Sequence, residues 1–216
     1  LARSLARDGH TIHAGDDELD PYLVASRFVR GSFQHPPPDR QPESALQVLS
    51  DYLDQHPEID VLMPVSDIAT RLISRQRDRF PKQVRLIVPD ALVVERCVDK
   101  AAMFELCEHL GVALAQRRIV TDQANLLDAV AEIGTPCVVK PVDACHYLFD
   151  RKAIILREAD EAAAALPYWP AEHASLCVQR FVDGPRHDIS FAAHRGRLIG
   201  AVDCKVLQTD RQDGTG

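Results

Sequence analysis

The stretch PCVVKPVDACHYLFDRKAIIL, residues 136–156, predicts two β-branched strands joined by a polar loop. Lys140 stands at the end of the first strand, directly before Pro141. One interpretation is that the lysine extends its stem to reach water, as strand-end lysines commonly do. The other is that its ammonium group binds an anion, and the rest of the chain bears on that choice.

The segments around this stretch predict an antiparallel sheet with helices. A helix with Asp99 as its N-cap ends at Gly111, a short strand follows at RRIV, and a helix capped by Thr121 leads into the quoted stretch. After it come the helical EADEAAAAL and three strands, SLCVQRFV, HDISFAAH and RLIGAVDCK, with hairpin-sized turns between them.

The first half of the chain alternates strands with helices. LARSLARDGH predicts a helix whose preceding strand is missing, HTIHAGD and SRFVRGSF predict strands, and the spacing in PESALQVLSDYLDQHP predicts an amphipathic helix. IDVLMPVSD predicts a strand covered on both faces, a helix over residues 67–79 follows, and VRLIVPD predicts another strand. This alternation predicts an open parallel α/β sheet. We therefore expect one domain at 1–97 and an α+β domain at 98–216.

Composition and charge exclude several classes of protein. The chain has 216 residues, 46% of them hydrophobic and 26% charged, which is typical of a globular protein. Its longest apolar runs stay well short of the roughly 18 residues that a membrane span needs. The formal net charge of -7, without a basic stripe, argues against binding to duplex nucleic acid. A small anion needs only a local cluster of cations, so that ligand class stays open.

The six cysteines contain no C-x-x-C pair and lie in apolar surroundings. This pattern favours buried free thiols in a reducing cytoplasm over a disulfide framework or a zinc site. The chain also contains far more arginine than lysine. It has 20 arginines and only five lysines: Lys82, Lys100, Lys140, Lys152 and Lys205. A lysine in such a chain is a mild indication that a compact, rotatable point charge is needed.

The order of these lysines resembles the ATP-grasp superfamily of ligases over nearly the whole chain. In that family a D-K pair opens the first nucleotide-binding lobe, and the lysine at the end of a P-x-V-[VI]-K-P strand meets the α- and β-phosphates. The matching positions here are Asp99, Lys100 and Lys140. The resemblance implies that 1–97 is the pre-ATP-grasp domain and that 98–216 is an ATP-grasp domain, incomplete at its C-terminus.

The resemblance also implies the remaining contacts to the nucleotide. The adenine hinge, E-x-x-[VIL] in the family, corresponds to Gln179, Arg180, Phe181 and Val182, whose backbone would read the purine edge. In the biotin carboxylase branch the strand continues as E-N-P-R-H, and this chain has DGPRH, which makes His187 the candidate for the ribose. Lys205 is expected to reach the transferred phosphoryl group. Arg211, in the segment TDRQDGTG, is the second candidate catalytic residue.

By resemblance, the parent protein would be an ATP-dependent ligase that activates a carboxylate as an acyl phosphate and forms an amide with an amine. ATP and Mg²⁺ would be its cofactors, with the metal ligands beyond the end of this chain. We expect no nucleic-acid or membrane partner, a cytoplasmic location, and small-molecule substrates, with a homodimer left open.

Two departures from the family keep alternatives open. The loop VDACHYLFDR after Lys140 has no glycine, although close backbone approach to phosphate favours glycine. Side chains such as His146, Arg151 or Lys152 would have to act over the phosphates instead. A nucleotide-binding module that never turns over is therefore the alternative. A dinucleotide-dependent oxidoreductase built on the first half is disfavoured, because no G-x-G-x-x-G is present.

Overall fold

The computed structural model describes residues 1–209, and the chain divides into two compact units, Leu1–Arg96 and Cys97–Gly216. Within the described residues, no helix has both the length and the apolar character needed to cross a membrane.

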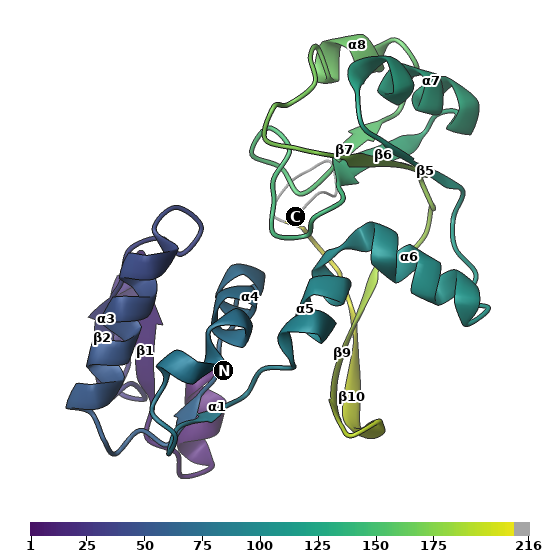
Figure 1. The fold of residues 1–216 in the computed structure, drawn as a ribbon. Coiled ribbons are helices and arrows are strands. Elements are labelled where there is room, and N and C mark those ends of the chain that lie inside the picture. Colours follow the sequence, from purple (N-terminus) through teal and green to yellow (C-terminus); the bar gives the residue numbers. More distant parts are fainter. Residues whose placement is uncertain (210–216) are drawn as a thin grey trace. The chain divides into compact units, whose positions relative to one another are not determined.

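The first unit alternates short strands with helices, as the sequence predicted (Figure 1). Its elements are α1 (Ala2–Arg7), β1 (His13–Asp16), α2 (Pro21–Val24), β2 (Gly31–Gln34), α3 (Pro42–Gln55), β3 (Val61–Leu62), α4 (Asp67–Arg75), a 3-10 turn (Arg77–Arg79) and β4 (Arg85–Leu86). The helix α5 (Ala91–Val98) begins in this unit and ends in the second. Proline at the first position of α3 has no N–H to leave unpaired, and Ser66 caps α4 by accepting from the Ala69 N–H at 3.2 Å.

All strand pairing in the described part of this unit is parallel, which confirms the predicted fold class. β1 pairs with β2 and β3 pairs with β4, as two separate two-stranded ladders. Buried side chains of this unit form one cluster, made of Leu46, Leu53, Ile73, Phe80 and Val84. The predicted doubly covered strand at IDVLMPVSD is wrong in extent. It is two residues long, and Val61 and Val65 are exposed, so this stretch is not covered on both faces.

The second unit is built on a four-stranded antiparallel sheet. Its elements are α6 (Lys100–His109), β5 (Arg117–Val120), α7 (Gln123–Ile133), β6 (Cys137–Pro141), β7 (Ile154–Leu156), α8 (Glu161–Ala165), β8 (Leu176–Arg180), β9 (His187–His194) and β10 (Arg197–Lys205). The strand order is β5-β8-β6-β7, so β8 lies between two strands that are distant from it in the sequence. The antiparallel sheet that the sequence predicted is confirmed.

The helices α7 and α8 cover one face of this sheet (Figure 1). The buried cluster beneath them includes Leu126 and Val130 of α7, Val139 of β6 and Val178 of β8. The N-cap of α7 is Asp122, whose carboxylate accepts from the Asn125 N–H at 2.9 Å. The predicted Thr121 cap is therefore wrong by one residue, because an aspartate directly follows it and fills the same role. The face of the sheet turned away from α7 and α8 carries the polar side chains discussed below.

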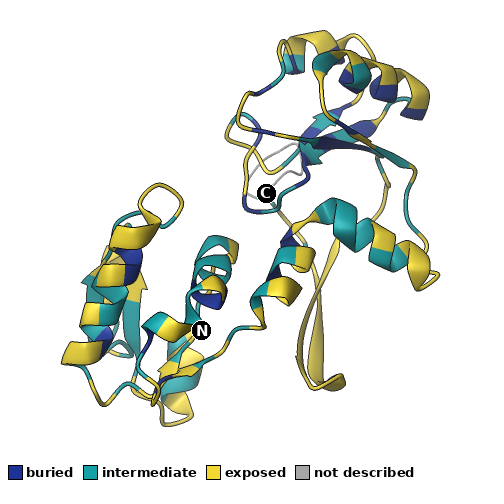
Figure 2. Cartoon of the chain, viewed as in Figure 1, coloured by how far each residue is buried: buried dark blue, intermediate teal, exposed yellow. Residues whose placement is uncertain are grey.

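The hairpin of β9 and β10 is exposed along its full length, as Figure 2 shows by its yellow colour. Its large apolar side chains, among them Ile189, Phe191 and Ile199, are exposed. The sequence also suggested a hairpin between β8 and β9. That prediction is wrong, because β8 pairs with β5 and β6, and β9 pairs with β10.

All six cysteines are free thiols, as expected. Cys137, Cys145 and Cys177 are buried, but the prediction of general burial is wrong for Cys97 and Cys204. Cys204 lies on the exposed hairpin, and Cys97 lies on the exposed side of α5.

Candidate nucleotide-binding site

Two lysines from separate elements come together at the end of β6. Lys100 is the first residue of α6, whose N-cap Asp99 accepts from the N–H groups of Ala101 and Ala102 at 2.8 and 3.2 Å. The Lys100 N–H donates to the Val142 carbonyl at 3.0 Å, which ties the start of α6 to the chain that leaves β6. The Nζ of Lys100 then donates to the carbonyl of Pro141 at 2.8 Å.

Lys140 projects from β6 onto the face of the sheet that α7 and α8 leave uncovered. Its Nζ donates to Oε1 of Gln179, on β8, at 2.7 Å. The strand register places Cys177 directly opposite Lys140 and Gln179 opposite Val138, so these side chains share one face. Both lysines are partly buried at this face.

Burial lowers the pKa of both lysines below the usual value, because desolvation disfavours the charged amine. For Lys100 the charges of Lys140 and Lys152 lower the pKa further, and Asp143 opposes them. Burial raises the pKa of the Cys177 thiol, and the charges of Lys140, Lys100 and Arg117 act against that rise. Lys140 lies directly opposite Cys177 in the strand register, and the Lys100 Nζ is bonded to the carbonyl of the neighbouring Pro141, in agreement with these effects.

Phe104 and Arg117 complete this face, and the sequence did not identify either as a site residue. The Phe104 ring of α6 lies 5.7 Å from the Lys140 Nζ and 4.5 Å from the Arg117 guanidinium carbon. Arg117 is opposite Gln179 in the register of β5 and β8 and donates to Glu108 at 2.5 Å. The alternation of side chains along RRIV could place Arg117 on the same face as Gln179 only once the order of the strands was known. The sequence did not provide that order.

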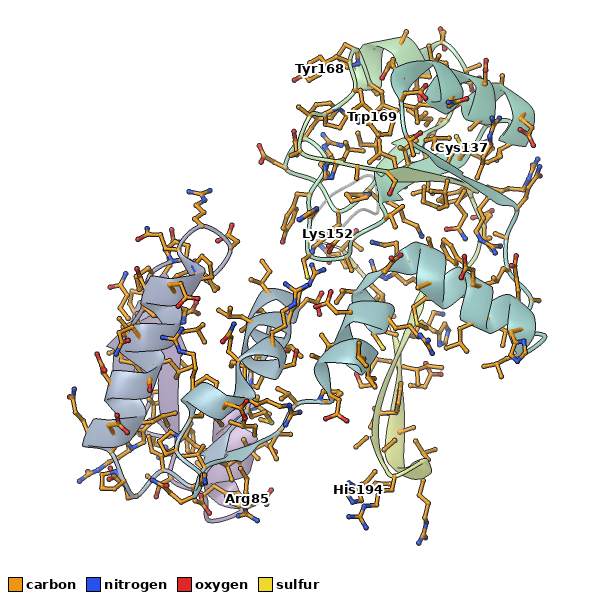
Figure 3. All side chains as sticks on the ribbon, viewed as in Figure 1. Arg85, Cys137, Lys152, Tyr168, Trp169 and His194 are labelled. Carbon is orange, nitrogen blue, oxygen red and sulfur yellow. The ribbon has the colours of Figure 1, made fainter. Side chains whose placement is uncertain are left out.

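The loop between β6 and β7 takes on left-handed backbone without glycine. Phe149 and Asp150 have φ angles of 48° and 60°, a region where bulky side chains are rare and strained by roughly 1–3 kcal/mol. Lys152 fixes the loop by donating from Nζ to the Ala144 carbonyl at 3.0 Å, and its Nζ lies 4.3 Å from the Tyr147 ring centre. Figure 3 shows Lys152 and Trp169 on opposite sides of the four-stranded sheet.

Two backbone N–H groups of the predicted hinge already form hydrogen bonds within the protein. The N–H groups of Arg180 and Phe181 donate to the carbonyls of Gln116 and Pro136 at 2.9 and 3.1 Å. The Arg180 guanidinium donates to the Ile133 carbonyl at the end of α7, on the face opposite the lysines. Val182 is 71% exposed. Of the predicted hinge, Gln179 is the residue that reaches Lys140.

The other predicted site residues lie on the hairpin or beyond the described chain. His187 pairs with Lys205 in the register of β9 and β10, and its Nδ1 lies 2.9 Å from the Asp203 carboxylate. No hydrogen bond or ion pair among residues 1–209 joins His187 or Lys205 to Lys100 or Lys140. Arg211 lies outside the described residues. The roles of these three residues stay predictions.

No family model matches the chain. A protein of Sinorhizobium fredii, described as the uncharacterized protein y4rH, is 32% identical over 106 residues, which cover 46% of this chain and 21% of that protein.

Solved structures match much more of the chain. An ADP complex of N5-carboxyaminoimidazole ribonucleotide synthetase covers 97% of this chain and 51% of its own, with a TM-score of 0.66 at 16% identity. L-amino acid ligase from Bacillus licheniformis covers 91% and 44%, with a TM-score of 0.66 at 16% identity. A β,γ-ATP complex of biotin carboxylase from Campylobacter jejuni covers 88% and 44%, with a TM-score of 0.56 at 14% identity. The chain spans about half the length of these structures.

Proposed function

Because the chain has the fold of the ATP-grasp enzymes over most of its length, we propose that its second unit binds ATP and that the full-length protein is an ATP-dependent carboxylate–amine ligase. The observation that carries this proposal is the position of two partly buried cations from separate elements: Lys140 lies on the face of the sheet that α7 and α8 leave uncovered, and the Nζ of Lys100 donates to the carbonyl of the next residue, Pro141. Burying two like charges together is unfavourable in an empty site. A polyphosphate would offset that cost with charge-assisted hydrogen bonds to both.

In this proposal the two lysines hold the phosphates and the hinge holds the base. Arg180 and Phe181 already donate their N–H groups within the protein, so we assign the adenine contact to the N–H of Val182. His187 is proposed for the ribose, and Lys205 and Arg211 for the transferred phosphoryl group.

When bound, ATP would supply the phosphoryl group that activates a substrate carboxylate as an acyl phosphate before an amine displaces it. The contribution of this chain would be to position the phosphates and to stabilise their charge. The described residues contain no group of three or more His, Cys, Asp or Glu side chains suited to a metal ion. We therefore assign no ligand within them to the Mg²⁺ that accompanies ATP in this proposal. A cytoplasmic location is part of the proposal and is supported by the free thiols.

One observation favours a second candidate, a nucleotide-binding module without turnover. The loop after Lys140 reaches its left-handed conformations through Phe149 and Asp150, so bulky side chains occupy positions where glycine would allow the backbone close to phosphate.

The experiment that tests the proposal measures ADP release by the full-length protein against panels of carboxylates and amines. The ligase proposal expects ADP release that needs both substrates and that Lys100→Met abolishes. Amide formation without ATP consumption would contradict it. Tight ATP binding without ADP release across the panels would favour the module.

A further inference from the structure

Aromatic and imidazole rings join the β1–β2 ladder to the helix α3, which lies beside it in Figure 1. The Nδ1 of His13 lies 2.8 Å from the Tyr52 hydroxyl, and the Phe33 ring stacks on the Tyr52 ring with 4.1 Å between their centres. The ring centre of His56, at the end of α3, lies 4.3 Å from that of Tyr52 and 5.0 Å from that of His13. We call these four residues, His13, Phe33, Tyr52 and His56, the imidazole cluster.

Two glycines allow these rings to lie against the strands. His13 is opposite Gly31 in the strand register, and Phe33 is opposite Gly15. A Cβ atom at Gly31 would lie 2.8 Å from both the His13 Nδ1 and the Tyr52 hydroxyl, and one at Gly15 would overlap the Phe33 ring. The cluster is therefore closely packed, and a new charge on His13 would act directly on its neighbours.

The charges near His13 come from several elements. Arg30 directly precedes β2, His56 ends α3, and Glu58 lies two residues further on. The Nδ1 of His56 lies 2.9 Å from a Glu58 carboxylate oxygen, so Glu58 stabilises the protonated form of His56. If His13 also became protonated, two positive rings with centres 5.0 Å apart would repel each other, and Arg30 would add to the repulsion.

Protonation of His13 therefore costs stability. Burial lowers the pKa of His13 from its usual 6.5, the charge of His56 lowers it further, and Glu58 acts in the opposite direction. Because the folded pKa is below the unfolded value, the stability is fully present above pH 6.5 and is lost as the pH falls from 6.5 toward the folded pKa. Burial also raises the pKa of Tyr52, so its hydroxyl stays protonated over this range.

We propose that the imidazole cluster is a pH-sensitive attachment of the β1–β2 ladder to α3, which holds while His13 is neutral and loosens when His13 and His56 are both protonated. The core cluster that contains Leu46 and Leu53 of the same helix is made of apolar side chains. The loosening should therefore be confined to β1 and β2. This inference concerns the first unit and does not depend on the proposed function.

The test measures amide hydrogen exchange in the full-length protein at low salt, at about pH 7.5 and about pH 5, with each rate corrected for intrinsic exchange. The protection of residues 13–16 and 31–34, relative to that of α3, should fall by about 4-fold or more in the wild type, because two unit charges 5.0 Å apart cost about this factor even at the dielectric constant of water. His13→Gln keeps a polar side chain and removes the titration, so its protection should fall by less than about 2-fold. His10→Gln, at an exposed histidine, is the matched control and should respond as the wild type does.

Equal falls in the wild type and in His13→Gln would overturn the inference, as would protection of both strands that stays unchanged at about pH 5. A loss that is equally large in α3 would also contradict it, because only the attachment is expected to loosen. If His13→Gln does not fold, His56→Gln still decides, since it keeps His13 and removes the neighbouring charge. The acid loss should then be smaller than in the wild type, and a loss of the same size would overturn the inference.

Discussion

Replacing Lys140 by methionine should stabilise the empty protein and abolish its response to ATP. Methionine keeps the length of the side chain and removes a partly buried charge whose hydrogen bond within residues 1–209 goes to Gln179. Burial lowers the pKa of Lys140, which means that the folded state disfavours the charged form. The same lysine would thus weaken the empty fold and create the affinity for phosphate.

The expected magnitude combines two opposing effects. Replacing buried ionic groups by apolar side chains of similar volume is often neutral or stabilising by about 1–4 kcal/mol. Leaving Oε1 of Gln179 without its donor costs roughly 1–3 kcal/mol if no water replaces it, and Gln179 is only partly buried. We expect a net gain of about 1 kcal/mol for the empty protein. ATP at 100 times its dissociation constant should add about 2.7 kcal/mol to the wild type and little to the variant.

The assay is urea unfolding with and without ATP, with Lys82→Met as the matched control because Lys82 is exposed. The control should change neither the free energy of unfolding of the empty protein nor the stability that ATP adds. A Lys140→Met variant that is less stable than the wild type when empty, or one that keeps the ATP-dependent shift, would refute the reasoning.

The pH dependence provides a second readout of the same variant. Because the folded pKa of Lys140 is below its unfolded value of 10.5, the penalty is fully present below the folded pKa and is lost as the pH rises toward 10.5. The stability gained by Lys140→Met should therefore shrink between neutral pH and pH 10.5.

Two further predictions concern the fold. Leu126→Ala should lower the free energy of unfolding by about 3 kcal/mol, because the Leu126 side chain of α7 is fully buried in the core cluster. The neighbouring Leu127→Ala should cost much less, because Leu127 is 39% exposed. Equal losses in urea unfolding would contradict the assigned core face. Arg71 and Arg75 lower the pKa of Glu95, so its contribution to stability is present above pH 4.5 and is lost as the pH falls through the folded pKa. Glu95→Gln should accordingly lose less stability than the wild type between pH 7 and pH 3, and identical losses would exclude Glu95 from the acid response.

Local patterns predicted most elements of the fold correctly. The i, i+3, i+4 spacing located α3, the Asp99 cap located α6, and the β-branched run located β6, because each signal lies within a few neighbouring residues. The pairing of β8 between β5 and β6 joins strands far apart in the chain, and no local signal encodes it. The suggested β8–β9 hairpin was wrong for this reason.

The site shows the same division between local and non-local information. The lysine positions were predicted from their motifs, and the contact between Lys140 and Gln179 followed only from the register of two strands. The sequence did not identify Phe104 as a neighbour of Lys140 and Arg117, because the face that α6 presents to the sheet depends on tertiary packing.

The most direct test of the central claim is a crystal structure of the full-length protein with a non-hydrolysable ATP analogue. We predict that the Nζ atoms of Lys100 and Lys140 both lie about 2.7–2.9 Å from phosphate oxygens of the analogue. An analogue whose phosphates lie away from this face, with both amino groups still bonded to Pro141 and Gln179, would contradict the claim.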